Sequence, residues 1–332
     1  MAEPSDSIAV NAGLAAALAG GDRRALARAV TLVESTRAPD QRAAEALLTR
    51  LLPRTGGAVR IGISGAPGVG KSTFIEAFGQ HLTGAGKRVA VFAIDPSSRR
   101  SGGSILGDKT RMEKLSRDPS AYIRPSPAGT TLGGVARRTR ESMLLAEAAG
   151  FDVVLVETVG VGQSETAVAD MTDLFVLLAS PGGGDDLQGI KRGVMELADL
   201  LLVTKADGDL TAAANRAAAD YHAALQLMRP RHVGLAPKVL KVSALEGAGI
   251  AAAWTEIAAL HGTLAADGRL ARLRAEQSRR WFWGELQTLV SEAILEDERL
   301  AEGAGRLEAE VADGTVLPSA AARTLIGHFR KG

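Results

Sequence analysis

The sequence predicts a doubly wound α/β domain with a mainly parallel sheet, extended by helical segments at both ends. Between about residues 58 and 260, short β-branched runs alternate with Gly-rich turns and Ala-rich helical stretches, the pattern of successive βα units. Some runs are apolar throughout, such as residues 153–156 and 200–203, as expected of parallel strands covered on both faces. Outside this region only helical periodicity remains.

Seven strands are expected in the alternating region, each bounded by turn-forming residues. They span residues 59–64, 88–94, 121–124, 151–157, 173–179, 199–204 and 238–243. The region 57–262 is therefore expected to be the central α/β domain.

Residues 1–56 are expected to form a helical extension. Gly20-Gly21-Asp22 ends one helix and caps the next, and a third helix at about 40–52 ends at Pro53. The pair Gly56-Gly57 marks the boundary to the α/β domain.

Residues 263–332 are expected to form a helical arm. Its expected helices span about 263–299, 304–312 and 318–330, separated by Gly- and Pro-containing breaks. The first helix carries an apolar stripe that needs a partner surface, so the arm is expected to make a homodimer. The stripe consists of Leu270, Leu273, Phe282, Leu286, Leu289 and Ile294.

Composition narrows the function classes. The 332 residues carry 39 Lys and Arg against 38 Asp and Glu, so a basic nucleic-acid surface is not expected. Cysteine is absent, which removes disulfides, thiolate zinc sites and cysteine nucleophiles. No signal-peptide pattern and no apolar run of about 18 residues is present, so we expect a cytoplasmic protein without a membrane anchor. The five histidines show no paired spacing typical of a metal site.

The strongest motif is a Gly-rich loop that follows the strand 59–64 and opens a helix. A loop of this kind in a strand–loop–helix context is a P-loop: backbone N–H groups and the helix amino terminus surround phosphate oxygens. Lys71 is expected to reach the β- and γ-phosphates, and the Ser72 hydroxyl to bind Mg²⁺. The expected nucleotide contacts are Gly65, Ala66, Pro67, Gly68, Val69, Gly70, Lys71, Ser72 and Thr73.

A second motif, Thr204-Lys205-Ala206-Asp207, directly follows the strand 199–204. The Asp207 carboxylate can accept hydrogen bonds from both N1–H and the 2-amino group of guanine. Adenine offers neither donor, and a site built for such bonds rejects analogues that lack them. Ser243-Ala244-Leu245 follows the last strand and is expected to contact the base through its backbone. Together with the P-loop, these residues predict GTP and GDP as ligands.

A third motif, Glu157-Thr158-Val159-Gly160, occupies the position of a γ-phosphate sensor, with Glu where Asp is usual. The Gly160 N–H is expected to bond the γ-phosphate and Glu157 to hold a magnesium-bound water. The extra methylene of Glu changes the usual geometry. Gln163, three residues beyond Gly160, is considered as a residue that positions the attacking water.

Two further segments carry acidic residues that fit a magnesium site. Asp95 follows the strand 88–94 beside the P-loop, where a carboxylate can hold a magnesium-bound or attacking water. Asp108 lies in the following Gly-rich segment and is a candidate Mg²⁺ ligand. The segment 180–191 contains three consecutive glycines and ends at Lys191. It is expected to act as a switch, with Lys191 contacting Glu157 or the phosphates, or else as a simple connector.

Four stretches together resemble the G3E GTPases of the MeaB/ArgK group. They are DPSSRRSGGSILGDKTRM (95–112), ETVGVGQSE (157–165), SPGGGDDLQGIK (180–191) and TKAD (204–207). The resemblance covers about residues 20–330. It implies a chaperone that gates adenosylcobalamin delivery to methylmalonyl-CoA mutase and protects that enzyme, working as a homodimer through its C-terminal helices. It also implies magnesium and catalytic roles for Asp95, Asp108 and Glu157.

Three alternatives stay open at this stage. One is a P-loop kinase of the ArgK type acting in amino-acid transport, although no segment is suited to an acceptor pocket or lid. Another is a nucleotide-binding scaffold with negligible hydrolysis. The third is a chaperone of a different B12-dependent acyl-CoA mutase.

Overall fold

The computed structural model describes residues 4–94, 112–125, 132–158, 164–181 and 192–330. It divides into two compact units, residues 1–274 and 275–332. The predicted division at residues 56 and 262 stays a prediction.

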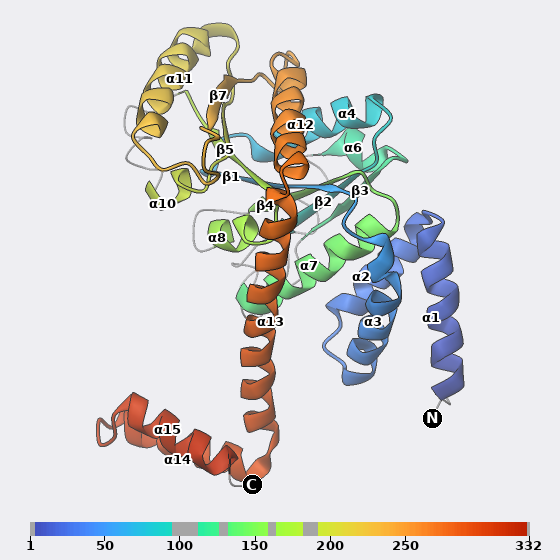
Figure 1. The fold of residues 1–332 in the computed structure, drawn as a ribbon, viewed down its shortest axis with the longest axis vertical. Coiled ribbons are helices and arrows are strands. Elements are labelled where there is room, and N and C mark those ends of the chain that lie inside the picture. Colours follow the sequence, from blue (N-terminus) through green and yellow to red (C-terminus); the bar gives the residue numbers. More distant parts are fainter. Residues whose placement is uncertain (1–3, 95–111, 126–131, 159–163, 182–191, 331–332) are drawn as a thin grey trace. The chain divides into compact units, whose positions relative to one another are not determined.

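The first unit is built on a seven-stranded parallel sheet in the order β3-β2-β4-β1-β5-β6-β7 (Figure 1). All seven predicted strands are confirmed, each within two residues of its expected bounds. They are β1 Val59–Gly65, β2 Val89–Ile94, β3 Ala121–Arg124, β4 Val153–Thr158, β5 Leu174–Ala179, β6 Leu200–Val203 and β7 Lys238–Lys241. The buried strands are the apolar runs of the sequence, because both faces of the sheet are covered. The predicted doubly wound α/β fold is therefore confirmed.

Helices cover both faces of this sheet (Figure 1). One core joins side chains of β2 and β4 to the N-terminal helices and to α7. The opposite core joins β1, β2, β4 and β5 to α4 and α12, and a third packs β5 and β6 against α11. The sheet-flanking helices are α4 Lys71–Gly84, α6 Glu113–Arg117, α7 Leu132–Ala148, α8 Ser164–Ala169, α10 Arg192–Met195, α11 Thr211–Gln226 and α12 Ile250–Ala266, with a 3-10 turn η2 at Gly208–Leu210.

The N-terminal segment forms helices α1 Pro4–Ala19, α2 Arg23–Glu34 and α3 Ala38–Leu51, followed by a 3-10 turn η1 at Leu52–Arg54. The predicted cap is confirmed, because the Asp22 side chain accepts hydrogen bonds from the N–H groups of Arg24 and Ala25. Leu26 and Val30 of α2 are buried in the core that also contains α7. The extension therefore shares its hydrophobic core with the sheet.

The C-terminal helices are α13 Arg269–Glu296, α14 Glu298–Ala312 and α15 Pro318–Phe329. The expected helix 263–299 is wrong, because α12 continues to Ala266 and a turn at Asp267-Gly268 separates it from α13. Gly268 is left-handed there, with φ +74°, and the Asp267 carboxylate accepts the Arg269 N–H at 3.0 Å. The expected start of a helix at 304 is also wrong, since Asp297 caps α14 by accepting the Leu300 N–H.

Three strands of the sheet are each preceded by an aspartate at their amino end. Asp152, Asp173 and Asp199 directly precede β4, β5 and β6. Each accepts a backbone N–H from the chain beside it: from Arg88 at 2.7 Å, from Arg60 at 2.8 Å and from Phe175 at 2.8 Å, respectively. These bonds satisfy N–H groups at the edge of the sheet opposite the P-loop.

Candidate active site

The phosphate loop lies between β1 and α4, at the carboxyl edge of the sheet. A side chain at Gly65 would place its Cβ 2.6 Å from the Leu178 carbonyl oxygen, so this position requires glycine. Gly70 is left-handed, with φ +97°, and is the N-cap of α4. The loop therefore ends at a helix amino terminus, where N–H groups and the helix dipole favour a phosphate.

Lys71 is the first residue of α4 and is only 9% exposed. Its Nζ donates hydrogen bonds to the carbonyl oxygens of Gly65 at 2.7 Å and Ala66 at 3.2 Å. Burial lowers the pKa of Lys71, and the charges of Glu157 and Glu165 oppose that shift. The ammonium group thus lies within the phosphate loop, where the charges of two carboxylates act on it. Phosphate oxygens of a bound nucleotide would compete with the two carbonyl oxygens for its hydrogen bonds.

Ser72 and Glu157, each predicted for the magnesium site, lie in contact. The Ser72 hydroxyl donates a hydrogen bond to Glu157 Oε1 at 3.3 Å. Glu157 lies in β4 and is 4% exposed. At the end of the same strand, the Thr158 hydroxyl donates to Ser64 Oγ at 2.9 Å. β4 is thereby tied to the strand that leads into the P-loop.

The chemistry of this pair fits Mg²⁺. A hydroxyl and a carboxylate oxygen are the ligand types that Mg²⁺ prefers, usually completed by water and substrate phosphates. Within the described ranges, no group of three or more His, Cys, Asp or Glu side chains could hold a metal ion by itself.

The segment after β6 lies against the phosphate loop. The Thr204 hydroxyl is buried and lies 2.7 Å from the Val69 carbonyl oxygen and 3.1 Å from that of Ala179. Lys205 has a positive φ of 53°, and its Nζ donates to the Gly68 carbonyl oxygen at 2.8 Å. The two side chains therefore hold the segment 204–207 to the P-loop.

Asp207 is oriented by the loop that follows β7. The Ser243 hydroxyl, which is fully buried, donates a hydrogen bond to Asp207 Oδ2 and accepts the Glu246 N–H at 3.1 Å. Ala206 donates its N–H to the Val242 carbonyl oxygen at 3.1 Å. The structure thus brings residues 204–207 and 243–245 together, as the sequence predicts.

The remaining predicted site residues lie outside the described part of the chain. These are Asp95, Asp108, Gly160, Gln163 and Lys191, together with residues 182–191 of the expected switch. Their roles stay predictions.

Sequence reasoning missed the role of Glu165. This carboxylate lies in α8, is 3% exposed and acts on the charge of Lys71. A short helix of six residues gives no periodicity that would predict burial. The available signal was its place directly after the Gly-rich segment that follows β4.

A cavity of about 360 Å³ lies at the opposite edge of the sheet. Its walls include the first residues of β5, β6 and β7 and one face of α12. Asp199 is its buried acid and is already bonded to the Phe175 N–H and, at 2.7 Å, to Arg231. This cavity is separate from the nucleotide loops, which all leave the carboxyl ends of the strands.

A protein-family comparison decides the family. Residues 26–299 match the family model described as methylmalonyl Co-A mutase-associated GTPase MeaB. The chain belongs to the MeaB family. The resemblance read from the motifs is therefore confirmed, and as a member of this family the chain is a GTPase with a nucleotide site for GTP and GDP.

Sequence similarity to individual relatives extends over nearly the whole length of this MeaB-family chain. A Caulobacter vibrioides relative whose description names a GTPase is 56% identical over 312 residues, covering 94% of this chain and 95% of the relative. The mouse methylmalonic aciduria type A homolog, mitochondrial, is 49% identical over 323 residues, covering 94% and 78%. A crystal structure named LAO/AO transport system kinase is 38% identical, covers 99% of both chains and has a TM-score of 0.77. Among the described residues, no helix is both long and apolar enough to cross a membrane.

Proposed function

We propose that this GTPase is a chaperone of methylmalonyl-CoA mutase that gates adenosylcobalamin delivery to the mutase and protects it. The observation that carries the proposal is the match of 274 of the 332 residues, 26–299, to a family described as associated with that mutase. The name of the mouse relative points the same way. Cobalamin itself is not proposed to bind this chain, since the resemblance places it on the partners.

The residues of the site support a specific division of labour in GTP hydrolysis. Lys71 neutralises charge on the β- and γ-phosphate oxygens, and hydrolysis depends on that electrostatic stabilisation. Ser72 and Glu157, which lie 3.3 Å apart, would hold Mg²⁺, whose charge supplies further neutralisation of the phosphates. Asp207, fixed by Ser243, reads the guanine base.

Residues outside the described ranges complete the proposed site. Asp95 and Asp108 are proposed to assist at the metal and the attacking water, Gly160 to bond the γ-phosphate and Gln163 to position water. Lys191, at the end of the Gly-rich segment 180–191, is proposed to couple nucleotide state to the partner. Unassisted turnover is expected to be slow because no arginine finger is obvious within the motifs. The partner is proposed to speed it by stabilising the transition state more than the ground state through this segment.

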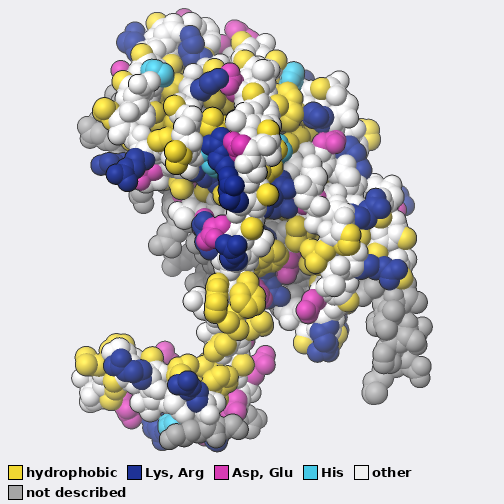
Figure 2. Space-filling model, viewed as in Figure 1, with side chains coloured by type: hydrophobic (Ala, Val, Ile, Leu, Met, Phe, Trp, Pro, Cys, Tyr) yellow, Lys and Arg dark blue, Asp and Glu magenta, His cyan; other side chains and the backbone are white. Residues whose placement is uncertain are grey.

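A homodimer through the C-terminal arm is part of the proposal. Phe282 and Trp283 of α13 are each 60% exposed, and Leu286 and Leu289 continue the apolar surface at 39% and 50%. Figure 2 draws this region of α13 as a gathering of hydrophobic side chains. Residues 282, 286 and 289 recur at helical spacing, which suits packing against a second helix.

The experiment compares GTP turnover with and without purified methylmalonyl-CoA mutase. The full-length protein is expected to turn over faster with the mutase and to bind it differently with GDP and with a non-hydrolysable GTP analogue. Lys71→Ala is the control for turnover from contaminating enzymes. No binding in either nucleotide state, together with no stimulation, would contradict the proposal, and stimulation by another B12-dependent acyl-CoA mutase alone would reassign the partner.

A kinase remains the second candidate because the structural relative at 38% identity is named a transport system kinase. It predicts stoichiometric transfer of ³²P from labelled GTP or ATP to a protein or amino acid. Release of inorganic phosphate with no labelled acceptor favours the GTPase role.

A further inference from the structure

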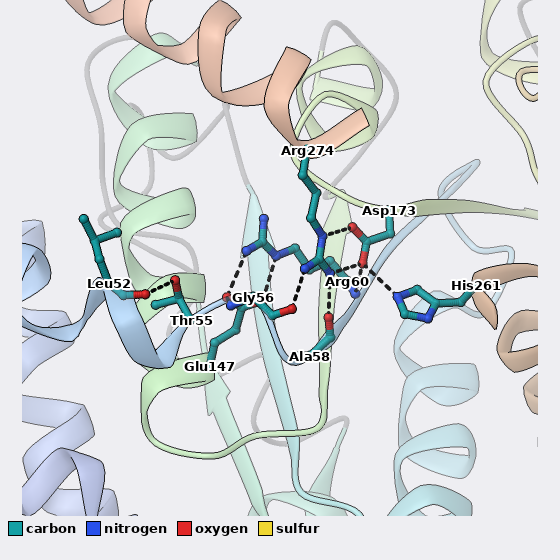
Figure 3. Close-up of polar contacts among 9 residues, drawn as sticks. All are labelled: Leu52, Thr55, Gly56, Ala58, Arg60, Glu147, Asp173, His261 and Arg274. Atoms are coloured by element: carbon teal, nitrogen blue, oxygen red, sulfur yellow. Dashed lines mark hydrogen bonds and ion pairs between the residues drawn. The ribbon is translucent and has the colours of Figure 1, made fainter. Parts of the chain in front are cut away.

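A buried ion-pair cluster lies at the amino edge of the sheet, away from the nucleotide loops. We call it the amino-edge joint; it consists of Gly56, Arg60, Glu147, Asp173 and Arg274 (Figure 3). Both carboxylate side chains are fully buried, and the two arginine side chains are 15% and 18% exposed. Two cations therefore balance two anions within the cluster, as buried charges require.

Arg274 is the cation contributed by α13. Its guanidinium binds both carboxylate oxygens of Asp173, from Nε at 2.8 Å and from Nη2 at 2.7 Å. It also donates to the carbonyl oxygens of Gly56 at 2.6 Å and Ala58 at 2.7 Å. The planar fork of arginine makes these four bonds at once, which the single ammonium of lysine cannot do.

Gly56 is held from both sides. Its carbonyl oxygen accepts from Arg274, and its N–H donates to Glu147 Oε2 at 2.7 Å. Gly56 has a φ of +90°, which favours glycine. It follows η1 and precedes β1, so it connects the N-terminal helices to the sheet.

Arg60 links the two carboxylates, so that the hydrogen bonds of the joint form a closed ring. Its side chain donates to both oxygens of Glu147, at 2.7 and 2.9 Å, and its backbone N–H donates to Asp173 at 2.8 Å. Every member of the joint is therefore bonded to two others or more. Removing one member leaves a buried charge or carbonyl without its partner, so the cluster is expected to respond as a unit.

We propose that the amino-edge joint couples the N-terminal helical extension to the start of α13, so that loosening either connection to the sheet loosens the other. The first turns of α13 have further anchors on the same unit: Leu270 packs against the sheet core and Arg269 donates to the Val233 carbonyl oxygen at 2.8 Å. These anchors do not touch the N-terminal extension. The shared element is the ring of bonds through Gly56, Glu147, Arg60, Asp173 and Arg274. A coupling of this kind is reciprocal.

Hydrogen–deuterium exchange of the full chain tests the coupling from both directions. Arg274→Ala is expected to speed exchange at least about tenfold in peptides covering 269–280 and also in those covering 52–60. Glu147→Gln, which alters the opposite side of Gly56, is expected to speed exchange in 269–280 as well. Arg272→Ala, an exposed position on the same helix, is the matched control and is expected to change neither by more than about twofold.

The result that overturns the proposal is a one-sided response. Faster exchange in 269–280 with an unchanged 52–60 after Arg274→Ala, or an unchanged 269–280 after Glu147→Gln, would reduce the joint to two independent contacts. Exchange in α4 and GDP binding monitor whether the variants remain folded. If Arg274→Ala does not fold, Arg274→Lys keeps the charge but not the fork and is judged by the same criteria.

Discussion

The Thr204 hydroxyl connects three segments of the nucleotide site, and Thr204→Val removes it at nearly constant shape. The hydroxyl carries one hydrogen, shared between the Val69 carbonyl oxygen at 2.7 Å and the Ala179 carbonyl oxygen at 3.1 Å. The Ala179 carbonyl oxygen also accepts the Thr204 backbone N–H at 2.8 Å, a bond that the substitution keeps. The Val69 carbonyl oxygen in the P-loop therefore loses more hydrogen bonding than that of Ala179.

The magnitude follows from this geometry. Losing one buried hydrogen bond and leaving a carbonyl weakly satisfied costs about 1–2 kcal/mol. For a unit of this size that lowers the melting temperature by about 2–4 °C per kcal/mol. Because Val69 belongs to the phosphate loop, the Kd for GDP is expected to rise about three- to tenfold.

The assays are thermal unfolding without nucleotide and titration with a fluorescent GDP analogue. Thr204→Ser is the matched control, since it keeps the hydroxyl and loses only a methyl group. A Thr204→Val protein that equals the parent in both assays would refute the argument. Equal losses in Thr204→Val and Thr204→Ser would assign the effect to packing.

Three other predictions concern recognition, turnover and pH. Asp207→Asn replaces an acceptor by an amide, so affinity for GTP should fall and affinity for XTP rise in competition binding; equal binding of ATP and GTP by the parent would count against this reading. Lys71→Ala should remove most GTP turnover, and an unchanged parent rate in EDTA would argue against the magnesium mechanism. Burial of Asp173 alone would raise its pKa, but the hydrogen bonds from Arg274 and the nearby His261, 3.6 Å away, outweigh it and lower the pKa to about 2. The stability that Asp173 contributes is present above about pH 4 and is lost as pH falls toward 2, by about 2 kcal/mol. In denaturant titrations, the free energies of unfolding of the parent and of Asp173→Asn should therefore converge in acid. A difference between the two that stays constant with pH would contradict the assignment.

The strands and the nucleotide motifs were predictable because their signals are local. A parallel strand covered on both faces is a short apolar run, and the runs 153–156 and 200–203 lie within β4 and β6. The P-loop and the segment 204–207 each follow such a strand directly. Their side chains consequently meet at the carboxyl edge, where Thr204 and Lys205 contact the loop.

The partners of buried charges could not be predicted in the same way. Arg274 and Asp173 are 101 residues apart in the sequence. The residues around Arg274, one of 39 Lys and Arg residues, do not indicate which carboxylate it binds. The sequence does not predict the break at Asp267-Gly268, because apolar residues continue at helical spacing on both sides. The left-handed Gly268 ends the helical run there although the apolar periodicity continues.

The three aspartates before β4, β5 and β6 bear on how the chain finds its fold. Apolar strands of similar composition can pair in several registers, because a slipped strand still buries leucine and valine. In the native register each of Asp152, Asp173 and Asp199 meets a backbone N–H of the adjacent segment. A slip by one residue would separate carboxylate from donor and, for Asp173 and Asp199, leave a buried charge poorly compensated. These hydrogen bonds therefore favour the native register over slipped registers that would bury a similar apolar area.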